Sequence, residues 1–174
     1  MAVASFQPAA VVYREEQNFD WWTYILVGLV EALAVFFLLQ NGHDPALPRS
    51  LSALAESILA VAVLAVPLLV LIGLLRMTTE VRLGDLRVWF GWVPTIRRVV
   101  SISNIQRLEV VTYRPLAEYG GWGVRRGRDG VRLLSARGNR GVRLDLADGT
   151  RIIIGSQKPE ALAVAIEQAM RPGG

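Results

Sequence analysis

The chain has 174 residues, of which 52% are hydrophobic, and 19 basic against 15 acidic residues give it a net charge of +4. It has no cysteine and one histidine, His43, which excludes disulfides, thiolate chemistry and the usual zinc sites. Eighteen of the basic residues are arginine, a preference that favours phosphate binding by guanidinium groups or, equally, reflects a genome-wide bias toward arginine codons.

Charge and hydropathy divide the chain near residue 75. Residues 1–75 contain the long apolar runs and carry a net charge of −4, whereas residues 76–174 carry +8. We therefore expect an N-terminal segment (1–20), an apolar region (21–75) and a basic domain (76–174).

The N-terminal segment contains one alternating stretch, Ala10 to Gln17. Alternation of apolar and polar residues is typical of a strand, which could join the sheet of the basic domain. Glu15 and Glu16 are poor strand formers, so a disordered tail is the alternative.

The first apolar run, Trp21 to Gln40, has twenty residues and would form a helix about 30 Å long. That length matches the hydrocarbon core of a bilayer. A secretory signal is the competing interpretation, but Glu15, Glu16 and Asp20 precede the run where such a signal carries positive charge. We therefore predict an uncleaved transmembrane helix.

A second apolar run follows a connector at 41–50 that is rich in turn residues. The run, 51–75, is also long enough to span, with a bend at Pro67. Together the two runs predict a transmembrane hairpin with helices at about 21–40 and 51–75. Arginines follow the second helix closely, so the positive-inside rule places both termini in the cytoplasm and the connector outside.

Two carboxyl groups fall within the predicted membrane helices. Glu31 lies near the middle of the first helix and Glu56 near the outer end of the second. A carboxyl group facing lipid is costly, so we expect each to be protonated or hydrogen-bonded in a helix interface, within one chain or between copies, or Glu56 to reach the outer surface. A proton or ion relay is the alternative.

In the basic domain, apolar and polar residues alternate as they do in half-buried strands. We predict about seven antiparallel strands and one closing amphipathic helix between Ser156 and Met170. This composition suggests a small barrel or sandwich covered by the helix, as in the pleckstrin-homology-like (PH-like) architecture. The predicted fold class is therefore a membrane-anchored α+β protein, a two-helix hairpin joined to a PH-like domain. The expected strands lie at 78–83, 86–90, 96–102, 104–113, 130–136, 141–146 and 151–155.

Several motifs follow one another along the chain, namely YREEQNF (13–19), the two apolar runs, TTEVRLGDLRVWFG (78–91), YRPLAEYGGWGVR (113–125), GNRGVRLDLADG (138–149) and IGSQKPEALAVAI (154–166). Their order resembles a family of bacterial membrane proteins with a PH-like domain of undefined function. The resemblance covers almost the whole chain. It implies the PH-like fold and a multi-pass location in the bacterial inner membrane, and it brings no catalytic residues.

The most unusual stretch is LAEYGGWGVRRGRDG, residues 116–130. Its glycine spacing does not match a dinucleotide-binding motif, it leads into a strand and not a helix, and no Walker lysine follows. We interpret the stretch chiefly as a structural corner or bulge, because glycine permits backbone angles that other residues avoid. The residues of this candidate structural motif are Gly120, Gly121, Trp122 and Gly123.

Arginines in and after this stretch are the candidate binding residues. On an anionic surface each arginine that approaches the headgroups contributes about 1 kcal/mol, so the cluster could orient the domain on a membrane without a specific ligand. Nucleic acid is not expected, since aromatic residues are not interleaved as stacking platforms. The candidate surface or lipid-headgroup residues are Arg125, Arg126, Arg128, Arg132 and Arg143.

Three aromatic residues, Trp89, Phe90 and Trp92, surround a glycine at the end of a predicted hairpin. They could form a surface patch, but aromatics at such ends are more often core residues or membrane-interface contacts. We expect them to be buried.

The sequence shows no nucleophile–base pair, no metal-ligand cluster and no phosphate loop, so we expect no enzyme activity, metal or cofactor. We expect a non-enzymatic membrane protein whose PH-like domain binds a protein partner or the anionic bilayer surface. The alternative is an accessory subunit of a transporter or other membrane complex, with Glu31 and Glu56 in helix packing or ion passage. A protein partner or a second copy of the chain could also bind through the membrane helices.

Overall fold

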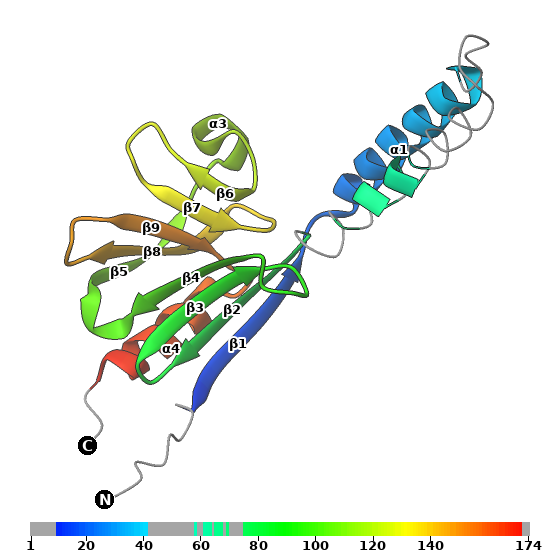
Figure 1. The fold of residues 1–174 in the computed structure, drawn as a ribbon. Coiled ribbons are helices and arrows are strands. Elements are labelled where there is room, and N and C mark those ends of the chain that lie inside the picture. Colours follow the sequence, from blue (N-terminus) through cyan, green and yellow to red (C-terminus); the bar gives the residue numbers. More distant parts are fainter. Residues whose placement is uncertain are drawn as a thin grey trace, which may run out of the picture.

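A computed structural model of the chain describes residues 10–41, 58, 61–63, 65–67, 69 and 75–171. In this part of the chain two β-sheets stand beside a projecting helix, α1 (Figure 1). The helices are α1 (Trp21–Asn41), α3 (Pro115–Tyr119) and α4 (Pro159–Met170), with a 3-10 turn, η1 (Ile102–Asn104). The strands are β1 (Val11–Asn18), β2 (Arg76–Arg82), β3 (Asp85–Phe90), β4 (Ile96–Ser101), β5 (Ile105–Thr112), β6 (Gly123–Arg126), β7 (Arg132–Ser135), β8 (Arg140–Leu146) and β9 (Arg151–Gly155).

The first sheet has the order β1-β2-β3-β4 and is antiparallel throughout. The second has the order β5-β8-β9-β7-β6, in which only the β7–β9 pair is parallel. The 3-10 turn η1 carries the chain from β4 in one sheet to β5 in the other. Each sheet therefore has two edge strands, β1 and β4 in the first and β5 and β6 in the second.

The main core lies between the inner faces of the two sheets and α4. Alternate residues of β2 and β3 point into it, as the period of two requires, and α4 contributes an apolar stripe at helical spacing. The helix contacts strands of both sheets, namely β1, β2, β5 and β8. Fully buried core side chains include Met77, Val81, Leu86, Val142, Leu144, Ile154, Leu162 and Ile166.

The described residues form nine strands, where about seven were predicted for the basic domain and one for the N-terminal segment. Each of the seven predicted stretches of the basic domain contains a strand, the N-terminal stretch contains β1, and β6 was not predicted. The sequence offers little signal for β6, because glycine and arginine dominate its four residues. The predicted C-terminal helix is present as α4.

The predicted transmembrane hairpin is wrong. None of the helices in the described part of the chain combines the length and the apolar character needed to cross a bilayer. Helix α1 has 21 residues, but its apolar part, Ile25 to Leu39, is only about 22 Å long and contains Glu31. The second predicted helix, 51–75, and the connector at 41–50 lie mostly outside the described residues.

This finding also corrects the expectations that rest on the hairpin. The membrane-anchored fold class and a multi-pass location in the bacterial inner membrane, with both termini in the cytoplasm, lose their support. The physical reason is that the prediction counted the aromatic and polar ends of the first run toward the span, although the apolar stretch between them is shorter than the hydrocarbon core.

The predicted N-terminal strand is confirmed as β1, and the disordered tail is excluded for these residues. The strand pairs with β2 along its length and is also tied to the loop between β9 and α4. The amide Nε2 of Gln17 donates to the Gly155 carbonyl at 2.9 Å. The Glu15 carboxylate accepts from the Ser156 hydroxyl at 2.6 Å and from the Gln157 N–H at 2.8 Å. These bonds fasten β1 to the end of β9 and to the segment that precedes α4.

The same carboxylate also accepts a hydrogen bond from the Tyr13 hydroxyl at 2.8 Å. Burial, followed by this bond and by the charge of Glu15, raises the pKa of Tyr13 well above the ordinary value for a phenol. The phenol therefore remains a neutral donor, and Glu15 satisfies donors from two parts of the chain that are about 140 residues apart.

We predict that Glu15→Ala lowers the free energy of unfolding by roughly 2–4 kcal/mol, because it removes the acceptor of three hydrogen bonds, one of them from a nearly buried hydroxyl. Glu167→Ala, at an exposed position on α4, is the control and changes it by about 0.5 kcal/mol or less. Chemical denaturation of the full chain measures both values. Equal values for the two variants would show that Glu15 does not fasten β1.

Candidate functional site

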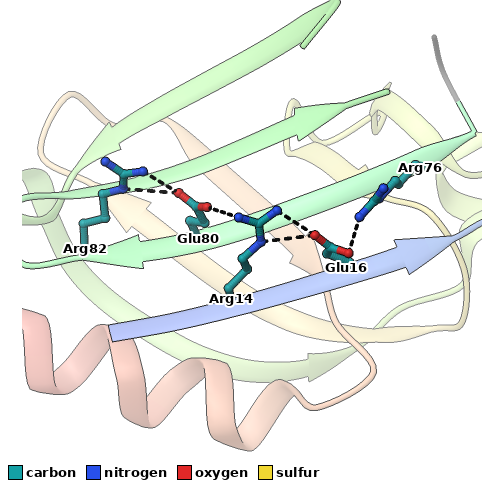
Figure 2. A network of polar contacts seen from close by, with 5 residues as sticks. All are labelled: Arg14, Glu16, Arg76, Glu80 and Arg82. Atoms are coloured by element: carbon teal, nitrogen blue, oxygen red, sulfur yellow. Dashed lines mark hydrogen bonds and ion pairs between the residues drawn. The ribbon is translucent and has the colours of Figure 1, made fainter. Parts of the chain in front are cut away.

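The outer face of the first sheet carries a row of alternating arginines and glutamates (Figure 2). Register places Arg14 of β1 opposite Glu80 of β2, so one guanidinium reaches two carboxylates. Arg14 bonds to Glu80 at 3.0 Å and to Glu16 at 2.7 Å. Arg82 bonds to the other oxygen of Glu80 at 2.8 Å, and Arg76 bonds to Glu16. We refer to these five residues as the ion-pair ladder.

Glu80 is the buried member of the ladder, with only 5% of its side chain exposed. A buried carboxylate is stable only when charge and hydrogen bonds replace the water that it has lost. Both of its oxygens have an arginine partner, which meets this requirement. For the more exposed Glu16, the hydrogen bond from Arg14, assisted by Arg76, holds the pKa below its usual range. The ladder therefore joins β1 to β2 by side chains as well as by the backbone.

A hollow of about 280 Å³ lies beside the ladder, over β2, β3 and the loop before β4. Its carboxylate, Glu80, is already paired, and Arg87 at its wall is paired with Asp85 at 2.6 Å. Among the described residues no ion pair involves Arg97. The hollow therefore presents unneutralised positive charge beside an aromatic ring. It is lined by Glu80, Arg82, Arg87, Trp89, Pro94 and Arg97.

The hollow adjoins β4, which is an open edge strand. Every residue from Trp92 to Val99 is exposed, including apolar side chains that sheets usually cover. The hydrogen bond from the Ile102 N–H to the Gly84 carbonyl, taken with the register of β3 and β4, identifies which residues of β4 are hydrogen-bonded to β3. Because ladder bonds alternate along an antiparallel pair, the N–H and C=O groups of Arg97 and Val99 point away from β3.

Each of the other three edge strands has a contact or a length that sets it apart from β4. Strand β1 is tied to the segment that precedes α4, as described above. Strand β5 is contacted by α4, and β6 has only four residues. Natural proteins cover or shorten edge strands because free backbone groups pair readily with other chains. The six-residue strand β4 has no such tie among the described residues, and its residues are mostly exposed.

The aromatic residues near this edge differ in environment. Phe90 is buried as expected, with 3% exposed, but Trp92 is 71% exposed and Trp89 is half-buried. The Arg76 guanidinium lies 4.6 Å from the centroid of the Trp92 ring, and Arg14 lies 5.9 Å from that of Trp89. The predicted burial is therefore wrong for Trp92, which adds an aromatic surface beside β4.

The structure places the predicted arginines in different surroundings. Arg125 donates to the Trp122 carbonyl at 3.0 Å, and Arg143 is paired with Glu109 at 2.7 Å. Arg126 and Arg132 face each other across β6 and β7, and Arg128 lies exposed in the turn between these strands. The sequence did not reveal this division, because it follows from strand register.

The glycine-rich stretch forms a corner between α3 and β6. Gly120 ends α3 in the left-handed conformation, with φ of 71°, and Gly121 and Gly123 also have positive φ. The indole Nε1 of Trp122 donates to the Gly138 carbonyl at 2.8 Å, and its ring lies 5.8 Å from that of Trp22 at the start of α1. The corner therefore supports the base of α1.

The apolar surface of α1 is largely exposed, and Glu31 lies half-buried on this helix. Glu56 lies outside the described residues. Contiguous exposed apolar surfaces are typical of places where proteins bind other molecules. The exposed large apolar side chains of α1 are Trp21, Trp22, Tyr24, Ile25, Leu26, Leu29, Val30, Leu33, Phe36 and Phe37.

In the ranges that the structure describes, no group of three or more histidine, cysteine, aspartate or glutamate residues could hold a metal ion. His43 lies outside them. No protein-family model matches the chain, and no curated protein is significantly similar to it. The resemblance to bacterial membrane proteins with a PH-like domain therefore stays an expectation from sequence motifs.

We predict that the contribution of Glu16 to stability is lost in acid. Folding lowers the pKa of this carboxyl, so its contribution is fully present above the ordinary glutamate pKa of about 4.5 and declines as the pH falls through the lower folded value. Urea unfolding of the parent and of Glu16→Gln from pH 7 to pH 3 measures the effect. The parent is the more stable at pH 7, and the difference shrinks below about pH 4. A difference in stability that is constant with pH would show that the ion pairs of Glu16 do not stabilise the fold.

Proposed function

We propose that the chain is a non-enzymatic binding module that takes up an extended, acidic segment of a protein partner along β4. The observation that carries this proposal is the open edge of β4, which combines free backbone groups, exposed apolar side chains and unpaired arginine. An extended peptide that pairs with such an edge gains backbone hydrogen bonds, and alternate side chains then reach the surface beside it.

The charge of the surface supports an acidic partner. Arg97 and Arg98 lie on the edge strand itself, and neither belongs to an ion pair among the described residues. Two arginines on an edge repel a second copy of the same strand and attract a strand that carries carboxylates. The nearby carboxylates Glu16, Glu80 and Asp85 are already paired and do not oppose such a partner.

A subunit role in a larger protein complex is the second candidate, and the exposed apolar surface of α1 favours it. In that arrangement α1 would pack against a helix of another protein or of a second copy. The two roles are compatible, because α1 and β4 are different surfaces.

We predict that a fluorescent eight-residue peptide of alternating Glu and Val binds the full chain and that binding weakens with added salt. Arg97→Glu should weaken it about tenfold or more, since the substitution reverses a charge beside the peptide. Val99→Pro should also weaken it, because proline removes an N–H that points to the free edge and not into the β3–β4 ladder.

Arg107→Glu on β5 is the matched control for charge, and its affinity should equal that of the parent. Fluorescence anisotropy measures the four dissociation constants, and circular dichroism checks that each variant is folded. The proposal fails if the parent does not bind the peptide at millimolar concentration, or if Arg97→Glu and Arg107→Glu bind equally well.

A further inference from the structure

A second hollow, of about 290 Å³, lies at the far side of the second sheet and is separate from β4. The turn between β6 and β7 and the turn between β8 and β9 form its walls. Eight residues line it, three of them arginines. They are Arg126, Asp129, Gly130, Arg132, Asp148, Gly149, Thr150 and Arg151.

Strand register brings two of these arginines together. Arg126 and Arg132 are direct partners across the antiparallel β6–β7 pair. Like charges at directly opposite positions repel and destabilise a sheet. No ion pair in the described part of the chain includes Arg126, Arg132 or Arg151. The hollow therefore holds positive charge that the described residues do not neutralise by direct contact.

The two carboxylates in the hollow are used to shape its turns. Asp129 accepts from the Val131 N–H at 3.2 Å, and Asp148 accepts from the Thr150 N–H at 2.8 Å. The hydrogen bond from the Thr150 N–H, followed by one from the Thr150 side chain, lowers the pKa of Asp148, with a smaller contribution from the charge of Arg132. The two carboxylates therefore fix the backbone around the arginines. Because each already accepts a backbone hydrogen bond, each has fewer lone pairs left for an arginine.

The third arginine is held in place by the opposite turn. The Arg151 guanidinium donates to the Asp129 carbonyl at 3.0 Å, which fixes it at the wall of the hollow and leaves further N–H groups for a ligand. A guanidinium group has five donors in a planar fork that matches the oxygens of a phosphate. Three such groups around one hollow supply donors from different directions.

We propose that this hollow binds one phosphate group, as free phosphate or as a phosphate monoester. The bound anion lies between Arg126 and Arg132, relieves their repulsion and accepts from Arg151. Recognition is by charge-assisted hydrogen bonds, which are stronger than neutral ones. The proposal does not depend on peptide binding at β4, because no residue of that edge lines this hollow.

The test compares thermal unfolding of the full chain in sodium phosphate and in sodium chloride of equal ionic strength at pH 7.5. Phosphate should raise the Tm of the parent, because a ligand that binds the folded state stabilises it. It also stabilises proteins by exclusion from their surface, so the comparison is made between variants. Arg126→Gln and Arg132→Gln remove one guanidinium each, and Arg107→Gln is the control.

The increase in Tm from chloride to phosphate should be the same for the parent and Arg107→Gln. It should be much smaller for Arg126→Gln and Arg132→Gln. In chloride, Arg126→Gln should melt at or above the Tm of the parent, because it removes a repulsion. Equal increases in all four proteins would overturn the proposal, since they would reflect exclusion alone. A lower Tm of Arg126→Gln in chloride would also contradict the repulsion on which the argument rests.

Titration with inorganic phosphate and with N-acetyl-phosphoserine amide, followed by 31P line broadening, identifies the source of the group. Comparable dissociation constants would assign the site to phosphate monoesters. Binding of inorganic phosphate alone would assign it to the free anion. In either case Arg126→Gln should weaken binding at least fivefold, and unchanged broadening in this variant would overturn the proposal.

Discussion

The attachment of β1 is the constraint on which the first sheet depends. This strand is separated from β2 by the whole apolar region, so chain connectivity does not hold the two strands in register. The backbone ladder, the ion pairs around the buried Glu80 and the hydrogen bonds of Glu15 to the segment before α4 hold them instead. With β1 fastened in this way, the other end of the sheet is β4, whose residues are mostly exposed.

The distribution of arginine follows from the same arrangement. On β1 and β2 arginines neutralise glutamates and stabilise the sheet, whereas at β4 and at the β6–β7 turn they lack acidic partners among the described residues. Paired arginines contribute to the fold, and unpaired ones are available for a ligand. Composition alone does not separate these roles, since both use the same residue type and differ only in what lies across the strand.

The strands were predictable because alternation and turn residues are local signals, and the buried stripe of α4 was predictable for the same reason. The predicted transmembrane hairpin was wrong, since the prediction counted Trp21, Trp22 and Gln40 as part of a span whose apolar stretch is shorter. The arginines were identified as candidates from the sequence, but their neighbours were not predicted. Strand register places Arg126 opposite Arg132 and Arg143 beside Glu109, and the sequence alone does not reveal that register. The open edge of β4 depends on sheet order and gives no signal in the sequence.

Amide hydrogen exchange of the full chain, resolved by residue, tests the central claim that β4 is a free edge. If the claim is correct, the amides of Arg97 and Val99 exchange rapidly, while those of Arg98 and Val100, which point toward β3, are protected. Equal protection of all four amides would contradict it, because it would show that β4 is already paired on both sides.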